Sequence, residues 1–274
     1  MNIRTQILLL FLSIILLFNC RPNLTDTAQA NFQKYYDEFD VSGSFVVFNL
    51  KNELYTFHNK EQFDKPFTPA STFKICNSLI GLETGIIENE NFIIQWDSVP
   101  MQYPKWNKDT DLKEAFQNST VWYFQELATR VGSDTMKFWL DKLHYGNADT
   151  SGGVDKFWLY GGLRITPAQQ IDFLRKLVEN NLPLSQRTMN IVKEIMTFEE
   201  TSSYTLKAKT GWGVQDNQDI GWFVGYLESN NNTYIFANCI QANNANNENF
   251  AKARIEITYK IITDIGIITA ADKK

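Results

Sequence analysis

Only one serine of the chain, Ser71, is followed three residues later by a lysine, Lys74. In a helix, residues at this spacing lie on one face, one turn apart. A serine hydroxyl is a weak nucleophile that needs a base beside it, and a lysine can be that base only as the neutral amine. Burial among apolar groups such as Phe73, Val121 and Trp158 favours the neutral amine, because the ammonium form loses its hydration. The spacing therefore predicts a nucleophilic serine with a lysine as its base.

Other hydrolytic sites are poorly supported by the residue pattern. The chain contains two histidines, His58 and His144, and no serine lies in a G-x-S-x-G segment, so a Ser-His-Asp triad is not expected. The chain also has no H-E-x-x-H segment and no Cys/His cluster with the spacing of metal ligands. We expect neither a metal site nor a bound organic cofactor.

Two further segments strengthen the prediction of a serine nucleophile. A second hydroxyl, Ser119, lies in a mixed polar and apolar segment that continues to Val121, and Lys209-Thr210-Gly211 ends a β-rich run. Glycine at a strand end permits close approach of a substrate or of another backbone, while Lys209 and Thr210 can hold a carboxylate. S-x-x-K, then a second serine, then K-T-G is the order found in penicillin-recognising enzymes. A plainer interpretation of Ser119 is that it caps a helix beginning near Val121.

On these residues the sequence resembles the class D serine β-lactamases, over residues 30–268. The matching segments are Ser71-Thr72-Phe73-Lys74, Ser119-Thr120-Val121, Tyr145-Gly146-Asn147, an omega-type loop at 157–162, and Lys209-Thr210-Gly211. The S-x-V and Y-G-N segments together distinguish class D from class A, whose second motif is S-D-N. One departure is Cys76, where the family commonly has proline; we expect it to point away from Ser71 and Lys74 and to alter packing only.

The resemblance implies a catalytic mechanism. Lys74 would react with carbon dioxide, supplied as bicarbonate, to form N6-carboxylysine, which would take the proton of Ser71 and later activate water. Trp158 would donate its indole N–H to the carbamate, and Ser119 would relay a proton toward the β-lactam nitrogen.

The resemblance also implies how a β-lactam substrate would be held. The backbone N–H groups of Ser71 and Trp212 would form the oxyanion hole, and Thr210 and Arg254 would bind the substrate carboxylate. The remaining expected contacts with substrate are Val121, Leu159, Lys209 and Gly211.

The elements that must position these residues follow from the pattern of apolar residues. Segments 44–48 and 54–57 read as a hairpin, and 204–209, 221–228 and 233–241 as three more strands. Residues 105–200 have mostly helical patterns, and a last helix is expected from about 248 to 264. The pattern predicts an α/β (α+β) fold, and the resemblance implies that this fold is of the serine β-lactamase/transpeptidase type. A central antiparallel sheet, built from both ends of the chain and flanked by helices, would carry a helical subdomain, all within one catalytic domain at 32–270.

The beginning of the chain predicts export. Arg4 precedes a twelve-residue stretch, Ile7–Phe18, that is apolar except for one serine and is too short to span a bilayer comfortably. Cleavage at Ala28-Gln29-Ala30 and lipidation of Cys20 after Leu17-Phe18-Asn19 both stay open. We expect a signal at 1–20, a tether at 21–31 and a periplasmic protein, in contact with a membrane only through a lipid on Cys20.

Charge and cysteine content bound the remaining alternatives. The 274 residues carry a formal net charge of −5 and no basic run, which excludes a nucleic-acid partner. Cys76 and Cys239 could pair or remain buried thiols. Three other functions stay open: a β-lactam sensor that remains acylated, a D,D-peptidase of peptidoglycan, and a structural lipoprotein. The sequence does not determine the antibiotic spectrum or the oligomeric state.

Overall fold

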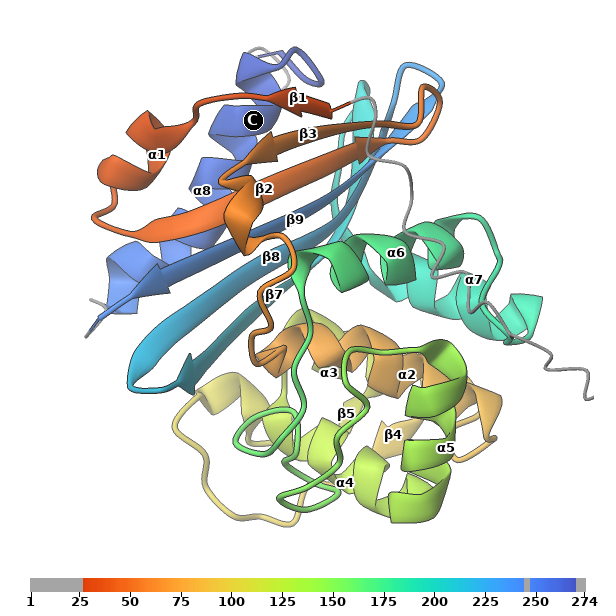
Figure 1. The fold of residues 1–274 in the computed structure, drawn as a ribbon. Helices are drawn as coiled ribbons and strands as arrows, with labels where there is room; N and C mark the ends of the chain where they lie inside the picture. The colour runs from red at the N-terminus through yellow and green to blue at the C-terminus, as the bar shows by residue number, and fades with distance from the viewer. Residues whose placement is uncertain (1–26, 244–246, 270–274) are drawn as a thin grey trace, which may run out of the picture.

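The computed structural model describes residues 27–243 and 247–269, and its centre is a seven-stranded sheet in the order β1-β3-β2-β9-β8-β7-β6 (Figure 1). All neighbouring strands are antiparallel except β1, which pairs parallel with β3. The strands of this sheet are β1 (Thr27–Gln29), β2 (Ser42–Asn49), β3 (Leu54–His58), β6 (Thr197–Glu200), β7 (Tyr204–Gln215), β8 (Gln218–Ser229) and β9 (Asn232–Ala242). A separate ribbon pairs β4 (Ile93–Ile94) with β5 (Thr110–Asp111).

Both ends of the chain build the sheet, as the sequence predicts. The hairpin β2–β3 joins the C-terminal strands through β2 and β9, whose register runs from Ser42 opposite Gln241 to Asn49 opposite Tyr234. Two-residue turns connect β7 to β8 and β8 to β9, and both turn pairs, 216–217 and 230–231, have positive φ. Asp and Asn tolerate this backbone better than other non-glycine residues, and such turns match the twist of a hairpin.

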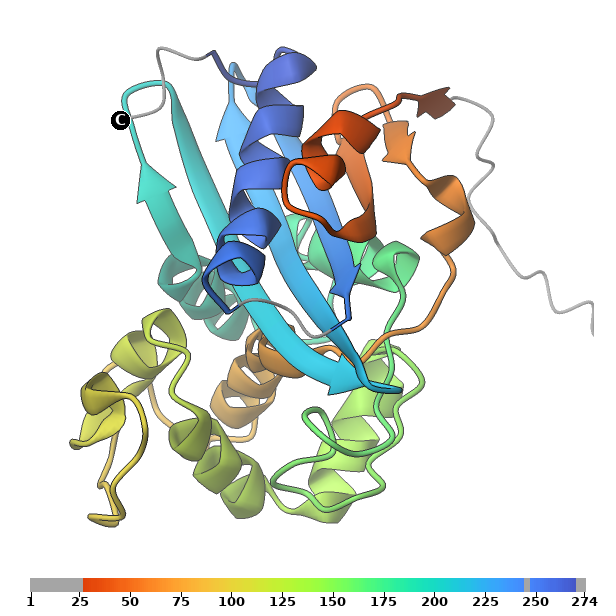
Figure 2. The ribbon, with the colours of Figure 1, turned by 90° about the vertical axis from the view of Figure 1, so that its left-hand side faces the viewer.

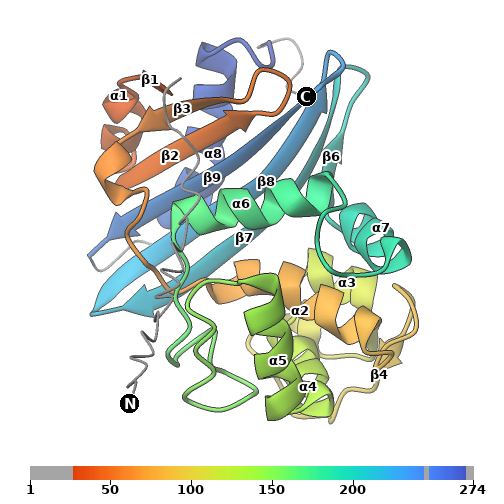
Figure 3. The same ribbon diagram turned by 45° about the vertical axis from the view of Figure 1, so that its right-hand side comes forward.

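Helices cover the two faces of the sheet unequally. On one face lie α1 and α8 (Figure 2), and on the other α6 crosses the strands above a helical subdomain that contains α2, α4 and α5 (Figures 1 and 3). The helices are α1 (Gln33–Asp37), α2 (Phe73–Glu83), α3 (Leu112–Gln117), α4 (Val121–Val131), α5 (Ser133–Leu143), α6 (Pro167–Val178), α7 (Gln186–Ile195) and α8 (Asn247–Asp264).

Each face of the sheet has its own hydrophobic core. The core beneath α8 includes Phe45, Phe223 and Ile257, while the larger core around α2 includes Phe73 and Trp222. Both Cys76 and Cys239 are free and fully buried. The interpretation as buried thiols is therefore confirmed, and the alternative of a disulfide between them is wrong.

The N-terminal boundary differs from the expected one. The segment predicted to be a tether, 21–31, contributes strand β1, and the N–H of Ala30 donates to the carbonyl of Phe57 at 2.9 Å. Such a short strand in a polar segment has no hydrophobic alternation, so the sequence pattern misses it. The signal at 1–20 and Cys20 lie outside the described residues. Within 27–243 and 247–269, no helix combines the length and apolarity needed to cross a membrane.

Candidate active site

The predicted nucleophile lies in a tight turn before α2. Ser71 is the middle residue of a 3-10 turn, Ala70–Thr72, and Ala70 has a φ of +46°. Two hydrogen bonds hold this strained turn: the N–H of Ala70 donates to the carbonyl of Trp158 at 3.1 Å, and the hydroxyl of Thr72 donates to the carbonyl of Pro69 at 2.7 Å. A non-glycine residue with positive φ persists only where its surroundings hold it. The turn therefore presents Ser71 in a fixed position.

The lysine beside the nucleophile is fully buried. The Nζ of Lys74 donates a hydrogen bond to the Oγ of Ser71 at 2.8 Å and lies 5.3 Å from the ring centre of Phe124. Burial, with a further contribution from the charge of Lys209, holds the pKa of Lys74 well below its ordinary value. Phe124 is not among the predicted neighbours, although it follows Val121 by three residues on α4 and so shares its helical face. The environment favours the neutral amine that a base requires.

The indole of Trp158 is buried without a hydrogen-bond partner. Its ring packs 5.1 Å from that of Phe73, and no acceptor among the described residues takes its N–H. An unsatisfied buried donor costs about 1–3 kcal/mol, so native proteins rarely keep one. A small anionic acceptor in this pocket would satisfy the donor.

The second hydroxyl faces the last motif across the site. The Nζ of Lys209 donates to the Oγ of Ser119 at 3.1 Å and to the carbonyl of Thr210 at 3.2 Å. Burial, with the charge of Arg254, lowers the pKa of Lys209 to about 7. Helix α4 begins at Val121 with Thr120 as its N-cap, and no side chain caps it, so the interpretation of Ser119 as a capping residue is wrong.

Strand β7 passes unusually close to the nucleophile turn. A Cβ added to Gly211 would lie 3.0 Å from the carbonyl oxygen of Pro69 and 3.1 Å from the Cγ2 of Thr72. The expectation of a close backbone approach at this glycine is thus confirmed, and the approaching backbone is that of the turn. On the other side of β7, Arg254 of α8 donates from Nη1 to the carbonyl of Gly211 at 2.7 Å. Burial lowers the pKa of Arg254 to about 10.

The Tyr-Gly-Asn segment holds the loop that carries Trp158. Tyr145 is buried with its ring edge-on to Phe73 at 5.6 Å. Asn147 donates from Nδ2 to the carbonyl of Gly162 at 2.9 Å and accepts from the N–H of Arg164 at 2.9 Å. These bonds close the base of loop 157–162, so the segment acts as a structural clamp for the indole.

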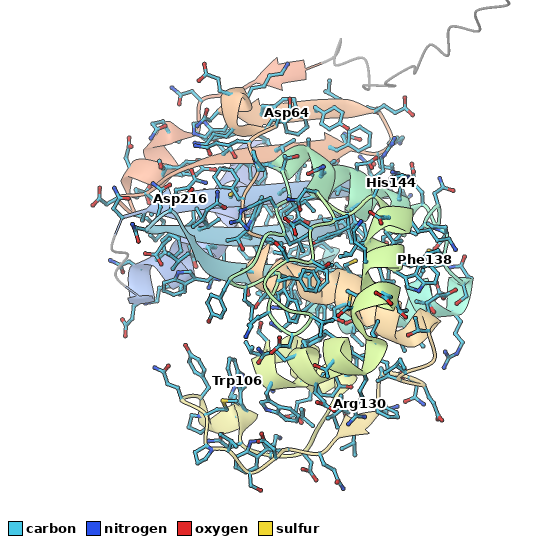
Figure 4. The ribbon with its side chains drawn as sticks, turned by 60° about the horizontal axis from the view of Figure 1, so that its bottom comes forward. Asp64, Trp106, Arg130, Phe138, His144 and Asp216 are labelled. Atoms are coloured by element: carbon cyan, nitrogen blue, oxygen red, sulfur yellow. The ribbon has the colours of Figure 1, made fainter. Side chains whose placement is uncertain are left out.

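A cavity of about 500 Å³ lies between the sheet and the helical subdomain. In Figure 4, Trp106 marks the wall on the side of the helices and Asp216 the tip of the β7–β8 hairpin. Its lining includes most of the predicted site residues: Ser71, Ser119, Val121, Thr210, Gly211, Trp212 and Arg254. Lys74, Trp158 and Lys209 are buried behind this surface. Leu159 packs against the larger core and does not line the cavity.

Comparison with known proteins assigns the family. A model of the penicillin binding protein transpeptidase domain matches residues 29–263. The chain is 43% identical to a class D β-lactamase YbXI from Nostoc, with a TM-score of 0.83 over 87% of this chain and 99% of that one. The chain belongs to the class D β-lactamases. Another relative in this family is the probable β-lactamase YbxI of Bacillus subtilis, 38% identical over 85% of each chain.

One further relative of this class D β-lactamase is named as a regulatory protein and not as a β-lactamase. The chain is 38% identical to the regulatory protein BlaR1 of Bacillus licheniformis over 79% of its own length, but spans only 36% of that protein. The fold expected from the class D resemblance is confirmed by these matches and by the sheet order. Among the class D motifs, the departure at Cys76 affects packing: the thiol lies in the larger core, away from the cavity.

Proposed function

We propose that the protein hydrolyses the β-lactam ring of penicillin-type antibiotics through an acyl-enzyme on Ser71, and so confers resistance. The observation that carries this proposal is the 2.8 Å contact between Ser71 Oγ and the fully buried amine of Lys74, at the wall of a cavity sized for a drug-like ligand. Membership of the class D β-lactamases supports the same reaction.

In the acylation step, Ser71 Oγ attacks the β-lactam carbonyl carbon while its proton passes to the side chain of Lys74. The negative charge that develops on the carbonyl oxygen would be held by the backbone N–H groups of Ser71 and Trp212. As the ring C–N bond breaks, the nitrogen receives a proton through Ser119. Lys209 supports this transfer, because it holds the Ser119 hydroxyl in place and makes it a better proton donor.

The residues around Lys74 fit a carbamate formed from carbon dioxide. Only a neutral amine reacts with carbon dioxide, and burial keeps the pKa of Lys74 low. The unpaired N–H of Trp158 supplies a donor for the carboxylate that results. When present, this group would supply a carboxylate oxygen that stays unprotonated near neutral pH and can accept the proton of Ser71 in acylation and that of water in hydrolysis of the ester.

Substrate orientation follows from the charges of the cavity. Thr210 and Arg254 line the sheet side and would hold the carboxylate of the antibiotic. Arg254 is already fixed by its bond to the carbonyl of Gly211, so little side-chain entropy is lost on binding.

A hydrolysis panel of penicillins, with and without added bicarbonate, tests the proposal. We expect multiple turnovers of benzylpenicillin, loss of turnover in Ser71→Ala, and a fall of at least ~10³-fold in Lys74→Ala, as expected on removal of a general base. Bicarbonate should raise the activity of enzyme that has been degassed or held at acid pH. No response to bicarbonate, together with full activity of Lys74→Ala, rules out the carbamate.

A sensor function is the second candidate, because BlaR1 is a relative. The two functions differ in the lifetime of the acyl-enzyme. Stoichiometric acylation of Ser71 that persists for hours, as seen by intact-protein mass spectrometry, would support the sensor and exclude the hydrolase.

We further propose that the protein is exported to the periplasm and anchored by a lipid on Cys20. Cleavage after Ala28-Gln29-Ala30 would remove β1, whose backbone pairs with Tyr55 to Phe57 at the edge of the sheet. Lipidation at Cys20 would leave this strand intact. Incorporation of a labelled fatty acid, absent in Cys20→Ala, would support the anchor, and a mature N-terminus at Asn31 would exclude it.

A further inference from the structure

The active-site cavity carries a second cation, on the wall opposite Arg254. Lys105 lies in a 3-10 turn, Pro104–Trp106, and lines the cavity from the helical side. No residue of the lining is acidic, although the protein as a whole has a net charge of −5. The lining therefore carries two positive charges and no negative one, which favours anionic ligands, and the two cations come from different walls.

Lys105 differs from a neighbouring lysine in having no ionic partner. Among the described residues, no carboxylate lies within 4.0 Å of its Nζ, whereas Lys108 pairs with Glu114 at 2.6 Å and does not line the cavity. The charge of Lys105 is thus available to a ligand. The charge of Lys108 is instead neutralised by its ion pair with Glu114.

The turn that carries Lys105 is fixed to the rest of the site. The indole of Trp106 donates to the carbonyl of Asn118 at 3.1 Å, and the indole of Trp122 donates to the carbonyl of Trp106 at 2.7 Å. The first bond ties the turn to the residue before Ser119. Because these bonds hold both the side chain and the carbonyl of Trp106, the residue after Lys105, binding would cost mainly the freedom of the Lys105 side chain.

Two aromatic rings flank this lysine in sequence and in the cavity wall. Tyr103 and Trp106 pack with their ring centres 4.8 Å apart, and both line the cavity. An aryl group on a ligand can stack on such a pair. The wall combines an aromatic surface with a free positive charge.

We propose that Lys105 is a subsite for a second carboxylate, and that the enzyme prefers β-lactams whose acyl side chain carries both an aryl ring and a carboxylate. This inference rests on the proposed function, which assigns the ring carboxylate to Thr210 and Arg254. A dianionic substrate then spans the two walls, with its second carboxylate at Lys105 and its aryl group at Tyr103 and Trp106.

The test compares benzylpenicillin with α-carboxybenzylpenicillin, which differ by one carboxylate on the side chain. The measurement is the second-order rate constant for acylation of Ser71. The result is the rate constant for the α-carboxy compound divided by the rate constant for benzylpenicillin. We expect Lys105→Gln to lower this ratio about fivefold, equivalent to about 1 kcal/mol, and Lys105→Glu to lower it further. Lys108→Gln is the matched control and should leave the ratio within twofold.

Ionic strength supplies a second readout. Raising the salt concentration from about 0.05 M to about 0.5 M should lower the ratio in the wild type and leave it unchanged in Lys105→Gln, because salt screens an exposed charge pair. An unchanged ratio in Lys105→Gln, or an equal fall in Lys108→Gln, overturns the inference.

The reaction of the wild type with benzylpenicillin alone shows whether the proposed function fails. If benzylpenicillin acylates the wild type and is not released, the hydrolase proposal fails while the ratio still tests Lys105. If neither compound acylates Ser71, both proposals fail.

Discussion

The Nζ of Lys209 lies 3.1 Å from the Oγ of Ser119, a residue 90 positions earlier in the chain. This bond joins β7 of the sheet to the segment before α4, and its donor is a buried lysine with a pKa near 7. The sheet side and the helical side of the site therefore meet at this hydrogen bond. Burying the charge of Lys209 is costly, but the bond can assist proton transfer through Ser119.

Lys209→Met should separate stability from activity. The substitution keeps the length of the side chain but removes a buried charge, so the free energy of unfolding should stay the same or rise by about 1 kcal/mol. Acylation by benzylpenicillin should fall by about 10²–10³-fold, because Ser119 loses its donor. Urea unfolding and stopped-flow acylation measure the two effects; parallel losses of stability and acylation would instead indicate a structural role.

Lys209→Met should also change the pH dependence of Lys74. The charge of Lys209 helps to lower the pKa of Lys74, so its removal should raise that pKa. A higher pKa leaves less neutral amine at a given pH, and the carbamate should then form only at higher pH. The midpoint of a ¹³C-carbamate NMR signal against pH reports this directly, without reference to activity, and a midpoint that does not move contradicts the coupling.

Trp158→Phe should weaken the proposed carbamate on Lys74 while leaving the fold intact. Phenylalanine keeps most of the packing against Phe73 but lacks the N–H that is unpaired in the structure. We expect turnover to fall by about 10²-fold, partial recovery with added bicarbonate, and a weaker ¹³C-carbamate signal. Lys74→Ala provides the baseline without any signal. Full carboxylation in Trp158→Phe would show that the indole N–H is dispensable.

Gly211→Ala should push β7 away from the nucleophile turn. The new Cβ would meet the Pro69 carbonyl oxygen at 3.0 Å, so the backbone must move by a few tenths of an ångström. We expect a loss of about 1–2 kcal/mol in unfolding free energy and at least a ~10-fold fall in acylation, because catalysis is sensitive to small displacements.

The matched control for this substitution is Gly85→Ala. Gly85 has a φ of +71°, and apart from its neighbours in the chain no atom lies within 4 Å of an added Cβ, so alanine there introduces backbone strain without a clash. It should cost about 1–2 kcal/mol of stability with unchanged acylation. Equal effects of both substitutions on acylation would show that Gly211 acts only through stability.

His58 should make the stability depend on pH. Its Nδ1 accepts the N–H of Phe32 at 3.3 Å, its ring stacks on Tyr36 at 4.7 Å, and burial lowers its pKa below 6.5. Below pH 6.5 the unfolded chain binds a proton that the folded protein does not, so stability should fall as the pH falls from 6.5 through the lowered pKa. Comparison of urea unfolding at pH 7.5 and 5.5 should show a smaller change in His58→Gln; an equal change would exclude His58 as the cause.

The sequence motifs predict most of the site because each motif is a short local segment with its own chemistry. Ser71, Lys74 and Thr210 could be assigned from local spacing and family resemblance. The partners that are distant in sequence could not: the bond from Lys209 to Ser119 and the proximity of Phe124 to Lys74 depend on how β7 and α4 pack.

The fold was predictable for a similar reason, with one exception. Long strands such as β8 and β9 are rich in apolar and aromatic residues, whereas β1 forms because β3 offers a free edge, and its sequence gives no signal. The capping interpretation of Ser119 is wrong for a local reason. Ser119 has a φ of +54° and lies one residue before the N-cap, so its side chain is free to face Lys209.

The pairing of β2 with β9 has a consequence for the timing of assembly. Ser42 lies opposite Gln241, so about 200 residues must be present before these strands can join. Contacts between such distant parts of a chain form late and slowly. If the chain is exported from its N-terminus, as proposed, it would complete its sheet only after almost all of it had emerged, and Arg254, carried by the last helix, would be the final part of the site to arrive.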